Sequence, residues 1–370
     1  MAFNKRVSDF FQTAVDEENQ SFFLTLVRFV FLLTSIGHGI ALEFRRLAYR
    51  LGLIHRRSLP CRVISVGNMT LGGTGKTEIT LAIAQKLKDQ KAALVSRGYG
   101  RQSPVPVQVV SGSDFPTLNY PMASDESVLM ARRLPGVPII CSANRFEGGM
   151  SAIRQFGSEW IVLDDAYQNL SLNRDLNVLV LDATNPFGNR RLFPRGILRE
   201  PIASMRRAQV VVINKVSGAR PEFIAQIERQ VRSLCNDSVT ILRCDYEFDA
   251  VIPCDGSEPD PVDTLKEGKW LAFSGLGNNR FFETMLQDFG VRISEFCTFP
   301  DHYPYDTADL EHILDKAKLR GADRIVTTEK DLIRLGPLSP LPHHLFGARI
   351  RVEFQGEGDP LSKKIGRAHV

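Results

Sequence analysis

Residues 61–77, CRVISVGNMTLGGTGKT, decide the fold. The β-branched run at 61–66 predicts a buried strand, and the glycine-rich segment after it leads into a helical stretch. Residues 70–77 fit the pattern G-x-x-x-x-G-K-[ST], except that Thr70 replaces the first glycine. A strand, a glycine-rich turn and a helix N-terminus in this order favour phosphate binding, because backbone N–H groups can turn toward phosphate oxygens. We therefore expect a nucleotide site here.

The loop residues have separate roles in binding ATP and magnesium. Glycines let the backbone approach phosphate oxygens closely, Lys76 reaches the β- and γ-phosphates, and the Thr77 hydroxyl can ligate Mg²⁺. Lys76 is therefore a candidate catalytic residue as well as a binding residue. The predicted ATP-binding residues of the loop are Thr70, Leu71, Gly72, Gly73, Thr74, Gly75, Lys76 and Thr77.

A second predicted strand, WIVLD at 160–164, ends in Asp164 and is followed by Asp165. Two carboxylates at the end of a buried strand are costly unless a cation is present, and phosphate-loop proteins hold Mg²⁺ at such a strand. We predict that Asp164 is a Mg²⁺ ligand. The alternative for Asp165 is a role as a helix N-cap.

Strand-like and helical segments alternate after Pro60, which predicts an α/β fold with a parallel sheet. A polar, proline-rich stretch at 253–261 is interpreted as a linker to a second, smaller α/β domain. The predicted parts are an N-terminal hydrophobic and basic helical segment (1–60), a phosphate-loop domain (61–250), the smaller domain (251–357) and a polar tail (358–370). The predicted strands are 61–66, 92–96, 137–141, 160–164, 177–182, 208–214, 269–275, 291–296 and 324–328.

Composition excludes several classes of protein. The 370 residues are 24% charged and 43% hydrophobic, which is typical of globular proteins and excludes fibrous and disordered chains. The six cysteines form no CxxC or other metal-binding spacing, so we expect free thiols in the reducing cytoplasm. Basic charge is concentrated at 21–62, where seven arginines face Glu43 alone, and this uneven pattern argues against a nucleic-acid partner.

The N-terminal segment combines an apolar run with this basic charge. Residues 22–42 are just long enough to span a bilayer, yet Arg28 and His38 would be costly at its centre. From Ile36 onward the apolar residues recur at helical spacing beside arginines, a pattern that suits the surface of an anionic membrane. We therefore expect peripheral or monotopic membrane contact. The alternative is a helical hairpin packed on the protein's own core.

Other nucleotide chemistries fit less well. The string at 214–217, NKVS, lacks the aspartate with which GTPases bind guanine, and Leu71 occupies the place of a lysine found in partitioning-type ATPases. A kinase needs a proton acceptor near the acceptor hydroxyl. Asp125, at a predicted helix start, and His302, in a turn-like segment, are candidates, although an N-cap at Ser124 or Asp125 and an exposed loop histidine are ordinary alternatives.

Several strings together resemble the tetraacyldisaccharide 4'-kinases of lipid A biosynthesis. The resemblance implies transfer of the ATP γ-phosphate to the 4'-hydroxyl of a tetraacyldisaccharide 1-phosphate, with Mg²⁺, at the cytoplasmic face of the bacterial inner membrane. It also implies two α/β domains with the active site in the cleft between them, and no obligate protein partner. The matching strings are VISVGNMTLGGTGKT (63–77), SRGYGR (96–101), SDESVLMARR (124–133), NR (144–145), LDDAYQN (163–169), LFPRGILREP (192–201), AFSGLGNNRFF (272–282), FPDHYPY (299–305) and TTEKD (327–331).

The resemblance assigns roles to single residues. Asp125 matches the catalytic aspartate and His302 the histidine that pairs with it, and the two would meet when the cleft closes. Asp164 and Asp165 match the metal site. The remaining matches are Arg145 (catalytic), Gln168 (nucleotide), Glu200 (metal) and Tyr99 (lipid disaccharide). Arg97, Arg101 and Arg199 are candidates to bind the substrate's 1-phosphate, because guanidinium groups suit phosphate oxygens. The alternative is that these arginines form surface salt bridges.

This chain departs from the family pattern at four positions. Ala166 and Asn169 stand in LDDAYQN where LDDGFQH is common, Ser124 replaces a glycine, and Glu78 replaces a proline after the loop. These changes bear on affinity and acyl preference more than on reaction type. A rival hypothesis is a membrane-bound phosphate-loop ATPase switch that acts through a protein partner, which would not need Asp125 and His302.

Overall fold

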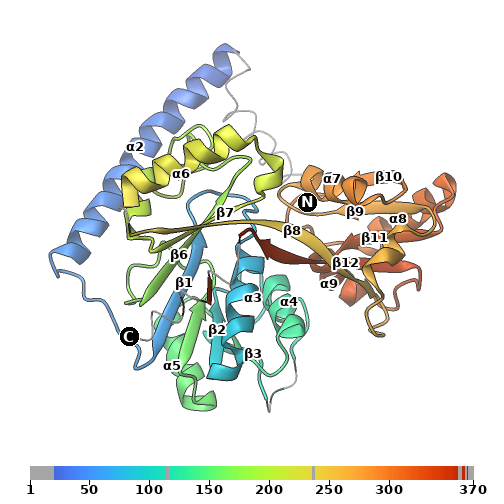
Figure 1. The fold of residues 1–370 in the computed structure, drawn as a ribbon, viewed down its shortest axis with the longest axis horizontal. Coiled ribbons are helices and arrows are strands. Elements are labelled where there is room, and N and C mark those ends of the chain that lie inside the picture. The colour runs from blue at the N-terminus through green and yellow to red at the C-terminus, as the bar shows by residue number, and fades with distance from the viewer. Residues whose placement is uncertain are drawn as a thin grey trace. The chain divides into compact units, whose positions relative to one another are not determined.

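The computed structural model describes residues 21–113, 115, 117–235, 238–356, 361, 362 and 365. It contains two compact units (Figure 1). Unit 1 comprises the described parts of Met1–Thr80, Trp160–Asp245 and Phe354–Val370, and unit 2 comprises those of Leu81–Glu159 and Tyr246–Glu353. Most of the predicted polar tail lies outside the described residues. The four-part division expected from the sequence cuts the chain at other points and stays a prediction.

Parallel strands form the centre of unit 1. Their order is β8-β7-β6-β1-β5, and all neighbouring strands in this order are parallel. Because β1 and β5 are parallel neighbours, the loop after β1 and the carboxylates after β5 emerge at the same edge of the sheet. The strands are β1 (Arg62–Asn68), β5 (Trp160–Leu163), β6 (Leu176–Asp182), β7 (Val210–Asn214) and β8 (Thr240–Pro253).

Helix α6 (Pro221–Cys235) covers one face of this sheet (Figure 1). Its apolar residues recur every three or four positions, and Ile224, Ile227 and Val231 pack on Val211 and Ile213 of β7. Burial of each such side chain stabilises the fold by about 1.5–3 kcal/mol. The predicted α/β fold with a mainly parallel sheet is confirmed.

In the part of the N-terminal segment that the structure describes, residues 22–50 form one continuous helix, α2 (Phe22–Arg50), and not a hairpin. The helix is attached to unit 1 by polar contacts along one side. The Ser35 hydroxyl donates to the Leu192 carbonyl at 2.8 Å and accepts from the Arg195 amide at 2.9 Å. His38 Nδ1 donates to the carbonyl of Phe193 at 3.0 Å.

Strands of unit 2 lie in two groups. One has the order β10-β9-β11-β12 with parallel pairings, and in the other β2 pairs with β4 in parallel and β3 pairs with β4 antiparallel. The stretch predicted as a linker instead follows β8 as a turn, closed by backbone hydrogen bonds between Val251 and Asp260. The strands are β2 (Ala92–Ser96), β3 (Val107–Ser111), β4 (Ile139–Ser142), β9 (Trp270–Ser274), β10 (Ile293–Thr298), β11 (Arg324–Thr328) and β12 (Leu345–Phe354).

Strand β9 shows how this unit builds two cores. Trp270 and Ala272 face α7, whereas the alternate residues Leu271 and Phe273 face α8 and α9, as the two-residue period of a strand requires. Helix α4 packs on α9, which brings its first residue, Asp125, into contact with Arg334 of α9. The helices of unit 2 are α4 (Asp125–Arg133), α5 (Arg145–Phe156), α7 (Asn279–Phe289), α8 (Thr307–Arg320) and α9 (Glu329–Leu335), together with the end of α3 (Lys76–Leu87), whose first residues belong to unit 1.

Candidate active site

The predicted phosphate loop connects β1 to α3 in unit 1. Gly72 and Gly75 have positive φ angles of 102° and 80°, which glycine adopts without strain. The side-chain amide of Asn68 donates to the Thr70 carbonyl at 2.8 Å and to the Thr74 hydroxyl at 2.9 Å. The loop therefore has a fixed shape, and the N-terminus of α3 begins at Lys76, where a phosphate would be stabilised.

Two residues at the carboxyl end of β7 hold the backbone of the phosphate loop. The sequence did not predict this role. Lys215 Nζ donates to the Gly73 carbonyl at 3.0 Å and pairs with the Asp182 carboxylate. Asn214 Nδ2 donates to the Thr74 carbonyl at 3.0 Å. The string NKVS lacks the guanine-binding aspartate, and its first two residues instead hold the loop backbone.

Asp164 is 3% exposed at the end of β5 and accepts a hydrogen bond from the Thr80 hydroxyl at 2.9 Å. Thr80 lies one turn after Thr77 on α3, so both threonines lie on similar sides of the helix. A buried carboxylate facing hydroxyls fits Mg²⁺, which takes one or two protein ligands together with water and phosphate oxygens. Thr77 and Asp164 are the residues that would hold the ion.

The other two predicted magnesium ligands are engaged with cations. Arg199 Nη1 contacts both oxygens of Asp165 at 2.9 and 3.0 Å, and Lys76 Nζ lies 3.7 Å from Asp165 Oδ1. Arg207 contacts both oxygens of Glu200 at 2.7 and 2.9 Å. Among the described residues no group of three or more His, Cys, Asp or Glu side chains could hold a metal ion. The four predicted ligands thus do not form one cluster.

Asp165 and Gln168 occupy the turn after β5. Asp165 has a φ of 46° and no helix begins there, so its N-cap alternative is wrong. Gln168 Nε2 donates to the Asn68 carbonyl at 2.7 Å and to Glu200 Oε1 at 2.8 Å. Gln168 therefore lies directly beside the start of the phosphate loop, where its predicted role in nucleotide binding requires it.

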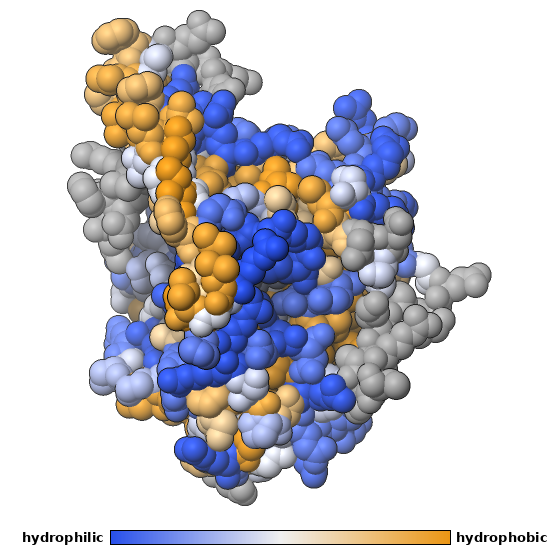
Figure 2. Space-filling model, turned by 90° about the vertical axis from the view of Figure 1, so that its left-hand side faces the viewer, coloured by the Kyte–Doolittle hydropathy of each residue, from blue (hydrophilic) through white to orange (hydrophobic). Residues whose placement is uncertain are grey.

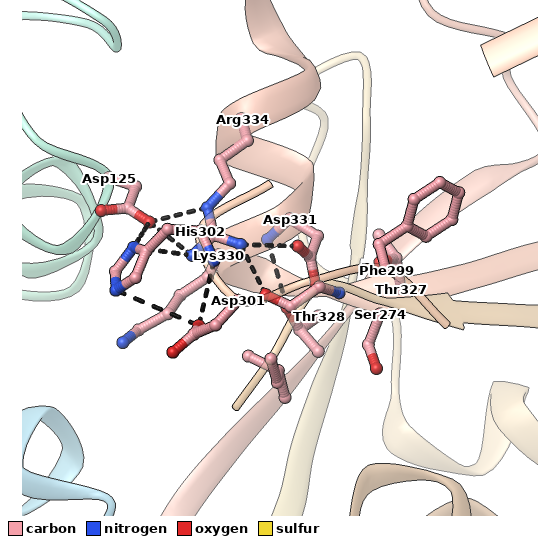
Figure 3. A network of polar contacts seen from close by, with 12 residues as sticks. Asp125, Ser274, Phe299, Asp301, His302, Thr327, Thr328, Lys330, Asp331 and Arg334 are labelled. Carbon is pink, nitrogen blue, oxygen red and sulfur yellow. Dashed lines mark hydrogen bonds and ion pairs between the residues drawn. The ribbon is translucent and has the colours of Figure 1, made fainter. Parts of the chain in front are cut away.

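The second group of predicted residues lies in unit 2 (Figure 3). Asp125 is the first residue of α4 and is 4% exposed, while Ser124 is the N-cap and accepts from the Ser127 amide. His302 Nδ1 lies 3.1 Å from Asp125 Oδ2. His302 has a φ of 55°, a left-handed conformation uncommon for a residue with a side chain. The structure brings the two residues together although 176 residues separate them in the chain.

Charges around this pair favour an ionised carboxylate. Burial alone would raise the pKa of Asp125, but the hydrogen bond with His302 and the charges of Arg334 and Lys330 hold the pKa of that carboxyl well below its usual range. The hydrogen bond to Asp125 raises the pKa of His302 above its ordinary value of 6.5, against the opposing effect of burial. Arg334 and Lys330 belong to α9 and were not predicted as site residues, although the string TTEKD includes Lys330.

Of the remaining predicted residues, Tyr99 lies beside His302. The Tyr99 ring is 73% exposed and lies edge-on to His302, with ring centroids 6.1 Å apart. Arg97, two residues before Tyr99 in the chain, is exposed. Arg101 Nη2 donates to the Val105 carbonyl at 2.7 Å. Arg145 is buried at the start of α5, where its Nη1 donates to the Ser142 carbonyl at 2.6 Å.

A phosphate loop after β1, a buried aspartate after β5 and a charged aspartate–histidine pair define the class of phosphate-loop phosphotransferases. A family model for tetraacyldisaccharide-1-P 4'-kinase matches residues 27–366. The chain belongs to this family.

Relatives that carry this name agree with the assignment. A tetraacyldisaccharide 4'-kinase of Syntrophus aciditrophicus is 38% identical over 338 residues, with 86% of this chain and 90% of the relative covered. One of Halothermothrix orenii is 34% identical, with 84% and 83% covered. The crystal structure of LpxK from Aquifex aeolicus in complex with ATP matches with a TM-score of 0.74 and 32% identity, covering 93% of this chain and 100% of that one.

Proposed function

We propose that this chain transfers the γ-phosphate of ATP to the 4'-hydroxyl of a tetraacyldisaccharide 1-phosphate. One observation supports this most directly: a chain of this family holds an aspartate–histidine pair at 3.1 Å in addition to a phosphate loop. A switch that transfers phosphate only to water has no use for a second acid–base pair. ATP is the nucleotide found with the matched Aquifex aeolicus structure.

The residues of unit 1 would bind the phosphates. Backbone N–H groups of the loop and Lys76 neutralise the β- and γ-phosphate oxygens as charge develops on them. Bound Mg²⁺, held by Thr77 and Asp164, would supply further positive charge at these oxygens. Lys215 and Asn214 keep the loop in shape through the carbonyls of Gly73 and Thr74. The unit thereby prepares the phosphoryl group for transfer.

The residues of unit 2 would prepare the acceptor. Asp125 stays ionised and orients the imidazole of His302 through Nδ1. The pair then takes the proton that the sugar hydroxyl loses, and the group of the pair whose pKa lies nearer to neutrality is His302. Tyr99 is exposed beside His302 and offers a face on which a sugar ring could stack.

This assignment predicts a pH dependence. The neutral form of His302 is the form able to accept a proton, and its pKa lies above 6.5, so the rate should fall as the pH drops through that raised value. Asp125 remains ionised over the same pH range, so its own titration does not change the rate there. Profiles of kcat/KM against pH will show this acidic limb, and His302→Gln should remove it. The substitution His343→Gln, at a side chain that is 93% exposed, is the control and should keep the limb.

Dependence on the acceptor tests the function itself. With tetraacyldisaccharide 1-phosphate in detergent micelles, ADP release should rise steeply and match the phosphate gained by the lipid. If ADP release were the same with and without the acceptor, and no lipid gained phosphate, the switch hypothesis would replace the kinase.

We further propose that α2 places the enzyme on the cytoplasmic face of the inner membrane. Among the described residues α2 is long and apolar enough to cross a membrane by length and composition, and only 11% of its apolar window is buried. Figure 2 shows a stripe of hydrophobic residues along this helix with hydrophilic residues beside it. Large exposed side chains recur at helical spacing at Phe22, Leu26, Phe29, Leu33, Ile36, Ile40, Phe44 and Leu47. This stripe suits insertion into one leaflet, with the arginines near headgroups.

Substitutions in the stripe test the membrane contact without removing the contacts of Ser35. Phe29→Asp, Leu33→Asp and Ile36→Asp together should weaken co-sedimentation with anionic vesicles at least about 100-fold, because each apolar side chain contributes about 1.5–3 kcal/mol when buried. The control Leu319→Asp changes an 81% exposed leucine on α8 and should have no effect. Unchanged sedimentation of the triple variant would show that the anchor lies elsewhere.

A further inference from the structure

Arg334 on α9 connects Asp125 to the core of unit 2 (Figure 3). Its side chain is 1% exposed. Nε and Nη2 contact Asp125 Oδ2 at 2.7 and 2.6 Å. Nη1 donates to the Gly275 carbonyl at 2.8 Å and to Asp331 Oδ1 at 2.9 Å. The guanidinium thus directs its donors to several acceptors at once, which fixes the plane of the group.

Asp331 holds the guanidinium in this position. It is fully buried, and besides Arg334 it accepts from the Tyr305 hydroxyl at 3.0 Å and from the Thr328 hydroxyl at 2.7 Å. The Gly275 amide also donates to it at 3.1 Å. A buried carboxylate with this many donors is a rigid anchor, so Arg334 has little freedom to move away from Asp125.

Arg334 also approaches the histidine of the pair. Nη2 lies 3.2 Å from His302 Nδ1, the same nitrogen that lies 3.1 Å from Asp125 Oδ2. When Nδ1 carries a proton it can donate to Asp125. When Nδ1 is unprotonated it can accept from Arg334 instead. Both forms of the imidazole therefore have a partner, and a doubly protonated imidazole would face a second positive charge.

We propose that Arg334 is a positioning residue of the Asp125–His302 pair, which fixes the carboxylate through Oδ2 and opposes a second positive charge on the imidazole. The inference rests on the proposed function, in which the neutral imidazole is the active form. Arg334 itself is buried and would act only through the pair. Among the described residues, the other charged, titratable or aromatic groups beside the pair include Tyr99, Tyr120, Asp301 and Lys330. Glu126 pairs with Lys330, and Asp331 pairs with Arg334.

Substitutions at Arg334 separate positioning from simple support of the fold. Arg334→Gln removes the charge, so His302 should hold its proton to higher pH. We expect kcat to fall about 100-fold, the KM for ATP to change less than about 2-fold, and the acidic limb of the pH profile to move upward. Arg334→Lys keeps the positive charge but lacks the planar guanidinium with its several N–H donors. The acidic limb should therefore return toward its position in the wild type, while kcat recovers only in part.

Arg133→Gln is the matched control. Arg133 also connects α4 to α9, through Glu329 at 2.8 Å, and it donates to the Ile350 carbonyl at 2.7 Å. Neither of these two contacts involves Asp125 or His302. Its substitution should lower the melting temperature without moving the acidic limb. If Arg133→Gln moved the limb as far as Arg334→Gln, or if Arg334→Gln left both kcat and the limb unchanged, the positioning role would be refuted.

A second readout is independent of the substrate. In protein labelled with ¹⁵N-histidine, NMR reports the titration of the His302 imidazole in the wild type, in Arg334→Lys and in Arg334→Gln. The titration should move to higher pH in Arg334→Gln and stay near that of the wild type in Arg334→Lys. Should Arg334→Gln not fold, an imidazole of the wild type that stays doubly protonated throughout the neutral range would refute the proposal. Lack of phosphate transfer by the wild type refutes the proposed function and leaves this titration to judge Arg334.

Discussion

Replacing Asp125 by asparagine is expected to abolish phosphate transfer while ATP still binds. Asparagine has nearly the same shape but no charge, so it can neither balance Arg334, 2.6 Å away, nor orient His302 as a carboxylate does. Loss of an acid–base group of this kind lowers rates about 10²- to 10⁴-fold. Initial rates at saturating ATP and lipid measure the loss of phosphate transfer, and calorimetry measures whether the variant still binds ATP.

A control is needed because Asp125→Asn leaves a buried cation without its partner, which can also lower stability. Asp306→Asn changes an exposed aspartate at the N-cap of α8, where asparagine caps equally well. It should retain activity and melting temperature. If Asp125→Asn transferred phosphate at a rate near that of the wild type, the pair would have no part in the reaction.

Replacing Lys76 by alanine should lower kcat/KM about 10³-fold or more, because one cation that stabilises developing phosphate charge contributes about 4 kcal/mol. The side chain is 15% exposed and lies 3.7 Å from Asp165, so in the absence of nucleotide it has a carboxylate partner near the loop. Unlike Asp125→Asn, this variant should also lose any hydrolysis of ATP that occurs without the lipid acceptor. Steady-state rates for transfer and for hydrolysis distinguish the two.

Lys86→Ala is the matched control for Lys76, since it removes a lysine from the last turn of the same helix. Its rates should stay close to those of the wild type. Turnover by Lys76→Ala within a few-fold of the wild type would contradict the assignment of the loop as the phosphate site.

The fold was predictable where strands are continuous apolar runs. The segment at 92–96 coincides with β2, and β1, β5, β6 and β7 fall within two residues of the predicted bounds. Strands β3, β8 and β12 were missed because polar and charged residues alternate with apolar ones in them, and alternation over a few residues is a weak signal. The two-unit division depends on contacts between distant segments, which no local pattern contains.

The candidate site was predictable only in part. The loop sequence indicates its own chemistry, and Asp125 and His302 were selected by resemblance before the structure placed them 3.1 Å apart. Arg334 and Lys215 were missed because the sequence does not show which arginine and lysine side chains are buried. Their roles depend on partners such as Asp125, 209 residues away from Arg334, and the sequence alone does not show that proximity.

The most direct test of the central claim is transfer of labelled γ-phosphate from ATP to tetraacyldisaccharide 1-phosphate in detergent micelles, with wild type and Asp125→Asn measured side by side. We predict that the wild type labels the lipid at its 4'-position and that the variant binds ATP without labelling it. Hydrolysis of ATP by the wild type with no label in the lipid would contradict the account.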